Sequence, residues 1–271
     1  MKDNGLLVQY FNANTPADQT LWAKAAKDAV TLKKIGATAV WFPPATKGAA
    51  GKEDMGYAPY DLYDLGEFNQ KGSVGTRYGT KKEYLEAIDA MKAQGINVYA
   101  DIAVRQKLGA DSVEKVTAAD FNAKDIPQMI GNKKIVGALS KFTFAGRRSK
   151  YSKFKWNWNH FAGIDWQQDD FKKRVCELSG MTEEEAEKKY KLSKYDYIIG
   201  SELDLYNQEV YDELMTWAKW YEDVTGVDGF RFQEAEKVPG WFIRDFAEAA
   251  SNAGEEEKEI FTVGDFWHWR C

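Results

Sequence analysis

The sequence contains little cysteine, little histidine and no surplus of positive charge. Its 271 residues include two cysteines, Cys176 and Cys271, together with two histidines, and the formal net charge is −5. Two cysteines are too few for a disulfide framework and lack metal-ligand spacing, so we interpret them as free thiols of a cytoplasmic protein. The acidic balance argues against the basic footprint that is typical of nucleic-acid binding.

Long apolar runs are also missing. No stretch of about 18 apolar residues occurs, so we predict no membrane span. The first residues, 1–11, enter a strand-like run almost at once, without the apolar segment and cleavage site of a secretory signal. Both features favour a cytoplasmic location.

The sequence is rich in hydrophobic and aromatic residues that can form a core, and their pattern predicts alternating strands and helices. Hydrophobic residues make up 44% of the chain and aromatic residues 14%, enough for one large α/β domain or two smaller ones. Thr80 and Glu83 form a capping box for one predicted helix, and Asn207 caps another. Buried strands separated by helices predict a parallel sheet. The predicted strands are 6–11, 37–42, 97–104, 227–232 and 259–265.

About 100 residues after the third strand break this alternation. They are rich in aromatic and charged residues, and 181–192 resembles a solvated helix or loop. A connection of that length is better explained by an inserted small domain than by a loop. We therefore predict strands 1–3 of the sheet in residues 1–104, an inserted domain in 105–206, and strands 4–5 in 207–271.

Five blocks of sequence resemble α-amylases of the bacterial liquefying type, in glycoside hydrolase family 13. The blocks occur in the family's order from about residue 5 to residue 267: they are GYAPYDLYDLGEFNQKGSVGTRYGT (56–80), FKWNWNHFAGIDW (154–166), YDYIIGSELDL (195–205), DGFRF (228–232) and FTVGDFW (261–267). The resemblance implies a (β/α)₈ barrel with a domain inserted after the third strand, hydrolysis of starch with retention, and a calcium ion between barrel and insert.

The catalytic positions implied by the resemblance are altered. A retaining glycosidase needs two carboxyl groups, but the nucleophile position, two residues after Arg231, is Gln233. An amide is a poor nucleophile. Glu234 is adjacent, but strand alternation turns it away from the side that Arg231 and position 233 share. The acid/base position is Asp265, where the family has the longer Glu, which alone would leave a slow enzyme.

The sugar and calcium positions have changed as well. The family's Asn-His after the third strand is Arg105-Gln106 here, so the sugar-holding His is Gln106. Because a guanidinium repels a divalent ion, we predict that calcium is lost and that no cofactor is bound. We expect Arg105, helped by Lys237, to pair with Asp196 or Glu202, the former calcium-site acids. The alternative is an Arg105 that points into solvent.

Some sugar-facing residues persist. Tyr57 occupies the position of an aromatic ring that stacks on the sugar, and Arg231 is retained. Each also has a structural interpretation: Tyr57 can pack the long loop, and Arg231 can serve a buried charge network. We interpret His160 as hydrogen-bonded structure, and the tryptophans Trp156, Trp158 and Trp166 as core of the insert.

The sequence displays five βα units of a partial TIM barrel and stops at Cys271, before the family's third carboxylate. We expect the open sheet edges to be covered by another protein chain or by self-association. Three functions compete: a non-catalytic, α-amylase-like pseudoenzyme that acts as a structural or interaction module, an α-glucan-binding module, and a residual α-1,4-glucan hydrolase. Loss of the nucleophile, the sugar-holding His and a calcium ligand together favours the first.

Overall fold

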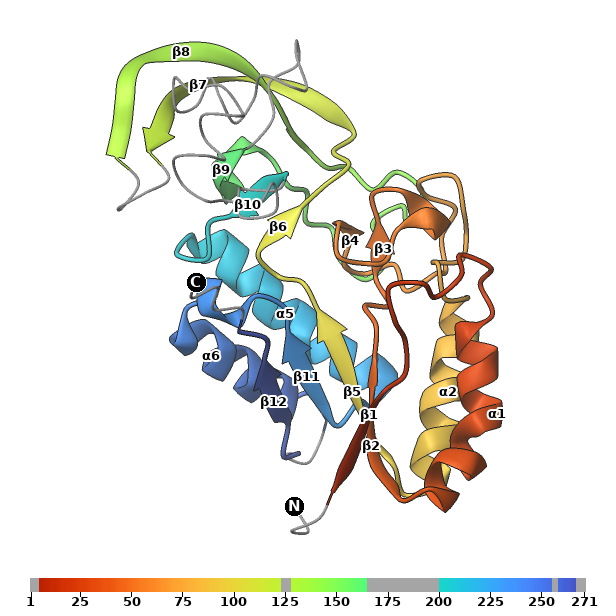
Figure 1. Ribbon diagram of the computed structural model, residues 1–271. Coiled ribbons are helices and arrows are strands. Elements are labelled where there is room, and N and C mark those ends of the chain that lie inside the picture. Colours follow the sequence, from red (N-terminus) through yellow and green to blue (C-terminus); the bar gives the residue numbers. More distant parts are fainter. Residues whose placement is uncertain (1–4, 123–127, 165–199, 255–257, 267–271) are drawn as a thin grey trace. The chain divides into compact units, whose positions relative to one another are not determined.

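A computed structural model describes residues 5–122, 128–164, 200–254 and 258–266 of the chain (Figure 1). Two compact units are present. The first unit comprises Met1–Arg105, Phe144–Lys153 and Leu205–Cys271, and the second comprises Gln106–Thr143 and Phe154–Asp204. Segment Phe144–Lys153 thus belongs to the first unit, although it lies inside the range predicted for the inserted domain, 105–206. The boundaries of that domain stay a prediction.

Five parallel strands form the sheet of the first unit, in the order β1-β2-β5-β11-β12. Each predicted strand is present, although the structure shortens all but 37–42 by two or three residues. Parallel neighbours joined by helices are the βαβ arrangement that the sequence predicts, and the sheet curls as part of a TIM barrel. The strands are β1 (Leu6–Gln9), β2 (Ala37–Phe42), β5 (Asn97–Ile102), β11 (Gly229–Phe232) and β12 (Phe261–Gly264).

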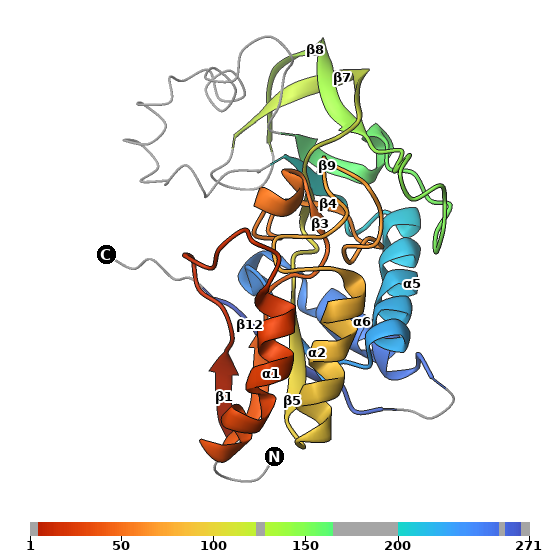
Figure 2. The same ribbon diagram turned by 90° about the vertical axis from the view of Figure 1, so that its right-hand side faces the viewer.

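Four helices cover one face of this sheet. They pack in pairs, α1 (Leu21–Lys34) with α2 (Lys81–Ala93), and α5 (Gln208–Thr225) with α6 (Gly240–Ser251) (Figures 1 and 2). The pairs meet where the hydroxyls of Tyr84 and Tyr221 hydrogen-bond at 2.9 Å.

The apolar residues of the sheet that face the helices form the core. Phe42 packs against Trp22 with ring centroids 5.3 Å apart, and Phe230 packs against Phe246 at 5.2 Å. Trp22, Phe42, Phe230 and Phe246 are completely buried. Alternation along each strand therefore sends Trp41, Tyr99 and Arg231 to the opposite, concave face.

The helix termini follow the signals in the sequence. The predicted capping box is confirmed: the Thr80 hydroxyl accepts from the Glu83 N–H, and the Glu83 carboxylate accepts from the Thr80 N–H at 2.8 Å. The predicted cap Asn207 is also confirmed, because its side chain accepts from Glu209 N–H at 2.9 Å. Helix α5 ends at Thr225 and is followed by Gly226, whose φ of 63° suits a residue without a side chain.

The second unit contains a three-stranded sheet and a long hairpin. The sheet has the order β6-β10-β9, and the hairpin pairs β7 with β8 in antiparallel fashion. Its strands are β6 (Gln106–Lys107), β7 (Ser112–Asn122), β8 (Gln128–Lys141), β9 (Phe161–Ile164) and β10 (Ser201–Leu203).

Several predictions fall on residues that the structure does not describe. They concern Cys176, Cys271, Asp196, Trp166 and the segment 181–192, which all lie outside the described residues. Within the described part of the chain, no helix combines the length and the apolar character needed to cross a membrane.

Candidate functional site

Arg231 is the centre of a charged network on the concave face of the first unit. Its strand β11 lies between β5 and β12, with Arg231 in register with Asp101 on one side and Val263 on the other. The guanidinium donates to Asp101 Oδ2 at 2.8 Å and also pairs with Asp265. It lies over the Trp41 ring, 4.4 Å from the centroid, a cation–π arrangement.

Asp101 is the buried member of the network. Its side chain is inaccessible to solvent, and Oδ2 also accepts a hydrogen bond of 2.6 Å from the Tyr57 hydroxyl. Burial raises the pKa of Asp101 to about 6, because desolvation favours the neutral acid, while Arg231 and Tyr57 oppose that shift. Tyr57 thus holds a carboxylate of the barrel, which gives it a structural role whether or not a sugar binds.

An open pocket of about 340 Å³ lies on the concave face beside this network. Its wall is mostly apolar, and Arg231 and Asp265 are the charged residues that line it. The lining residues are Leu7, Trp41, Tyr99, Arg231, Val263, Gly264 and Asp265. The sequence did not single out Trp41. Its place in strand ATAVWF, between Val40 and Phe42, is the signal that could have placed it on the concave side.

Gln233 follows β11 and is half-buried. Its N–H donates to Ile102 O at 3.0 Å, so the chain continues beside β5 for one residue after the strand ends. Asp265 is fixed in the same way, because its N–H donates to Phe232 O at 3.0 Å and its carbonyl accepts from Ala235 N–H at 2.9 Å. Both catalytic positions of the resemblance are therefore at the carboxyl ends of adjacent strands.

Glu234, the nearest carboxylate in sequence, is held by two cations. Arg105 donates to Oε2 at 2.7 Å and Lys237 donates to Oε1 at 2.6 Å. Although burial alone raises its pKa, the hydrogen bond from Lys237 and the charge of Arg105 keep the pKa of Glu234 below its ordinary value. Glu234 also has a φ of 49°, in the left-handed region, so the strand direction ends here. This arrangement counts against Glu234 as a replacement nucleophile.

Arg105 pairs with Glu234, which is not one of its predicted partners. Its pairing with Glu234 was not foreseen, and it contradicts the alternative in which Arg105 points into solvent, because the side chain is 7% exposed. The expected partner Asp196 lies outside the described residues, and Glu202 is in β10 of the second unit. A guanidinium has no lone pair to offer a metal, so residue 105 does not fit as a calcium ligand. Calcium loss itself stays a prediction.

Two further predicted residues belong to the second unit. Gln106 is buried in β6, where it is paired with Glu202 of β10. His160 is buried, and its Nδ1 accepts from Asn157 N–H at 3.1 Å, which confirms the hydrogen-bonded interpretation. Trp156 is buried next to His160 and Phe161, as expected of a core residue. In the first unit, the structure brings together Tyr57, Asp101, Arg231 and Asp265, and Gln233 lies two residues after Arg231 in the chain.

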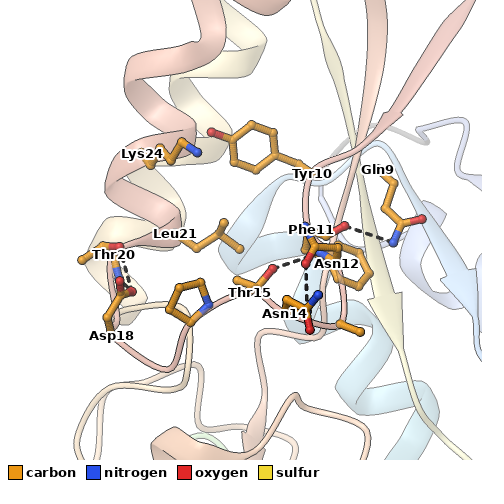
Figure 3. Close-up of a pocket in the computed structure, with 12 residues that line it drawn as sticks. Gln9, Tyr10, Phe11, Asn12, Asn14, Thr15, Asp18, Thr20, Leu21 and Lys24 are labelled. Carbon is orange, nitrogen blue, oxygen red and sulfur yellow. Dashed lines mark hydrogen bonds between the residues drawn. The ribbon is translucent and has the colours of Figure 1, made fainter.

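A larger cavity, about 760 Å³, lies in the loop between β1 and α1 (Figure 3). Amide side chains and aromatic rings line it, together with Lys24 from α1. The Tyr10 hydroxyl donates to Asp28 at 2.6 Å, and Asn12 N–H donates to the Thr15 hydroxyl at 2.9 Å. Most of its lining residues are exposed, so it is an open groove, and no sequence pattern pointed to it.

The fold and the site together define an α/β-barrel protein. The charged network of Asp101, Arg231 and Asp265 lies toward the carboxyl ends of the strands, where the active sites of such barrels lie. Comparison with known proteins identifies the family. The chain is 43% identical over 268 residues to "Alpha-amylase" of Geobacillus stearothermophilus, covering 98% of this chain and 48% of that protein. It is 36% identical over 273 residues to "Cytoplasmic alpha-amylase" of Escherichia coli K12, covering 97% and 54%. The chain therefore belongs to the α-amylase family.

Solved structures show the same fold at low identity. An α-amylase from Malbranchea cinnamomea superposes with a TM-score of 0.54 at 15% identity, covering 97% of this chain and 47% of that one. A debranching enzyme from Nostoc punctiforme gives 0.55 at 16%, covering 97% and 48%. No family model matches. The chain spans about half the length of the curated relatives it matches.

Proposed function

We propose that this chain is an α-amylase-like protein that has lost hydrolysis and acts as a structural or protein-interaction module. The observation that carries the proposal is the chemistry around Arg231. The nucleophile position holds the amide Gln233, and the nearby carboxylates Asp101, Asp265 and Glu234 are each paired with a cation. Retaining hydrolysis needs one carboxylate free to attack and one carboxyl group with a proton to give.

Asp265 is poorly placed to act as the acid/base. Its side chain is one methylene shorter than the family's Glu, which withdraws the carboxyl group by about 1 Å, and such a displacement alone costs on the order of a hundredfold in rate. In addition, Asp265 has to leave its pair with Arg231 before it can hand a proton to a leaving group. With an amide at position 233, no covalent glycosyl ester can form in the family's usual way.

Activity measurements test the loss of hydrolysis. We expect the purified chain to release no more reducing sugar from starch than its Gln233→Ala variant, because position 233 contributes no nucleophile in either protein. Assays at several pH values between 5 and 8 cover the range in which Asp101 titrates. Release by the wild-type chain clearly above that of Gln233→Ala contradicts the proposal and favours the residual hydrolase.

The interaction role rests on the two edges of the main sheet. Leu6 and Leu7 on β1 are 41% and 45% exposed, and Val263 on β12 is 36% exposed. Parallel sheets are normally covered on both faces, and an open edge with apolar side chains is a template for a further strand. We propose that another polypeptide, a different protein or a second copy, covers these edges.

Sedimentation tests the interaction role. We expect the wild-type chain to associate in a concentration-dependent way, and Leu7→Lys or Val263→Lys to weaken that association at least tenfold, because each places a charge on a pairing edge. Val30→Lys is the matched control, since Val30 is an equally exposed apolar residue, 47%, on helix α1. A stable monomer at all concentrations contradicts coverage of the edges by a second copy, and equal weakening by Val30→Lys contradicts the role of the sheet edges in self-association.

A second candidate, α-glucan binding, is favoured by one observation: Arg231 and the Trp41 and Tyr99 rings still line a cavity on the concave face. Neutral sugars bind between such rings and polar groups. Titration with maltooligosaccharides separates this candidate from the interaction module, because a module without a sugar site gives no saturable signal.

A further inference from the structure

The ammonium group of Lys47 lies in a closed shell of oxygen atoms. Lys47 begins the short strand β3 (Lys47–Gly48), and its side chain is inaccessible to solvent. Its Nζ lies within hydrogen-bond distance of the carbonyl oxygens of four residues and faces a carboxylate oxygen of Asp64 at 3.5 Å. The carbonyl partners are Phe68 at 3.2 Å, Ser73 at 2.8 Å, Val74 at 2.6 Å and Gly75 at 3.4 Å.

This arrangement is that of a cation-coordination site. An ammonium group has three N–H donors, whereas five oxygens surround it, so the oxygens are arranged around the charge and not around individual N–H bonds. Four of the five are carbonyl oxygens, which can only accept a hydrogen bond, whereas burial raises the pKa of the fifth group, Asp64, against the opposing charge of Lys47. Burial lowers the pKa of Lys47, and the carboxylates of Asp64 and Asp61 oppose that shift. The shell itself therefore favours the charged form.

The oxygen shell belongs to one loop, residues 64–75, that is folded by its own hydrogen bonds. Asp64 Oδ1 accepts from the N–H groups of Gly66, Glu67 and Phe68 at 2.8–3.2 Å. A bridge between Gln70 and Ser73 closes the tip, and its turn brings the carbonyls of 73–75 toward Nζ. Gln70 Nε2 donates at 3.0 Å to Asp64 Oδ2, the oxygen that faces Nζ.

We propose that residues 64–75 form a cation-binding loop whose cation is the chain's own Lys47 ammonium, and that the emptied loop binds a free primary alkylammonium ion. This inference is independent of the loss of hydrolysis. The strand that begins with Lys47, β3, pairs with β4 (Pro59–Asp61), which starts two residues after Tyr57.

Chemical rescue tests the proposal. Lys47→Ala removes three carbons and the nitrogen, the atoms of n-propylammonium. We expect its melting temperature to fall by on the order of 10 °C, because a carboxylate and four carbonyls lose their partner. Millimolar n-propylammonium is expected to restore much of this loss in a saturable way. Tetramethylammonium at the same ionic strength has no N–H donor and is expected to have no effect. The wild type is expected to respond to neither ion.

The matched control is Lys47→Met, which occupies the space of the lysine side chain with a neutral side chain of similar length. We expect it to be destabilised like Lys47→Ala and to gain nothing from n-propylammonium. Equal effects of n-propylammonium and tetramethylammonium on Lys47→Ala, or equal rescue of Lys47→Met, overturn the proposal.

A second route covers the case in which Lys47→Ala does not fold. Lys47→Cys is unfolded and alkylated either to the aminoethyl or to the propyl thioether, which have the same number of heavy atoms and differ in the terminal ammonium. The wild-type chain, treated identically, accounts for Cys176 and Cys271. We expect only the aminoethyl form to refold with a melting temperature near that of the treated wild type. Equal refolding of both forms overturns the proposal.

Discussion

Replacing Arg147 by Met is expected to lower the free energy of unfolding of the first unit by about 3–5 kcal/mol, because the change leaves a buried carboxylate without its cation. The Arg147 side chain is 1% exposed, and its Nε donates to Asp61 Oδ2 at 2.8 Å. One Nη also donates to the carbonyl of Ser152 at 2.6 Å. The guanidinium lies over the rings of Tyr63 and Phe144, about 5 Å from each centroid.

We expect the substitution to weaken the attachment of a whole segment and not only one ion pair. Arg147 belongs to Phe144–Lys153, which is part of the first unit but stands in the sequence between the two stretches of the second unit. Phe144 packs on Tyr60 at 5.2 Å, and the Ser152 hydroxyl donates to Glu213 at 2.6 Å. Without Arg147, the segment loses the group that joins it to Asp61. We therefore expect faster proteolysis within 144–153 in the variant, in addition to the lower stability.

Arg148→Met is the control for this prediction, because Arg148 is the next residue and is exposed. It removes the same charge at the same place in the chain, and we expect it to change the free energy of unfolding by less than about 0.5 kcal/mol. Urea unfolding of both variants, followed by tryptophan fluorescence, measures the difference. Similar losses in the two variants mean that net charge, not the buried pair with Asp61, determines the effect.

The fold could be predicted largely because its signals are local. The capping box at Thr80, the cap at Asn207 and the alternation of apolar strands with amphipathic helices each depend on residues close in sequence. The hairpin β7–β8 was not predicted. Its pairing shifts register between Ala118 and Asp120, so the period of two that identifies a strand changes phase within the segment.

The candidate site could be predicted only in part. Alternation along β11 correctly places Arg231 on the concave face, but strand patterns do not give the register between strands that are far apart in sequence. The pairs Arg231–Asp265 and Arg105–Glu234 depend on that register and on the turn after Phe232, where Glu234 enters the left-handed region. Local patterns identify which residues are charged, whereas the partners depend on the complete sheet.

Replacing Arg231 by Met is expected to cost about 3–5 kcal/mol of unfolding free energy at pH 7, because Asp101 and Asp265 both lose their cation. The loss should depend on pH through Asp101. In the wild type its pKa is raised from 3.8 to about 6, so the folded protein binds this proton more tightly than the unfolded chain. The contribution of Asp101 to stability is therefore greatest below pH 3.8. It declines by about 3 kcal/mol as the pH rises past 6.

Removing Arg231 takes away the positive charge that holds the Asp101 pKa down, so the pKa rises further in the variant. Asp101 then stays protonated at pH 5, where a neutral acid needs no cation, and the difference between wild type and Arg231→Met should shrink from pH 7 to pH 5. Arg231→Lys keeps a charge at this position and is expected to lose less stability at pH 7. The double variant Arg231→Met/Asp101→Asn removes the titrating group and should lose most of the additional pH dependence. Chemical unfolding at pH 5 and pH 7 measures all four proteins, and a deficit in Arg231→Met that is the same at both pH values means that Asp101 is not the group whose charge Arg231 balances.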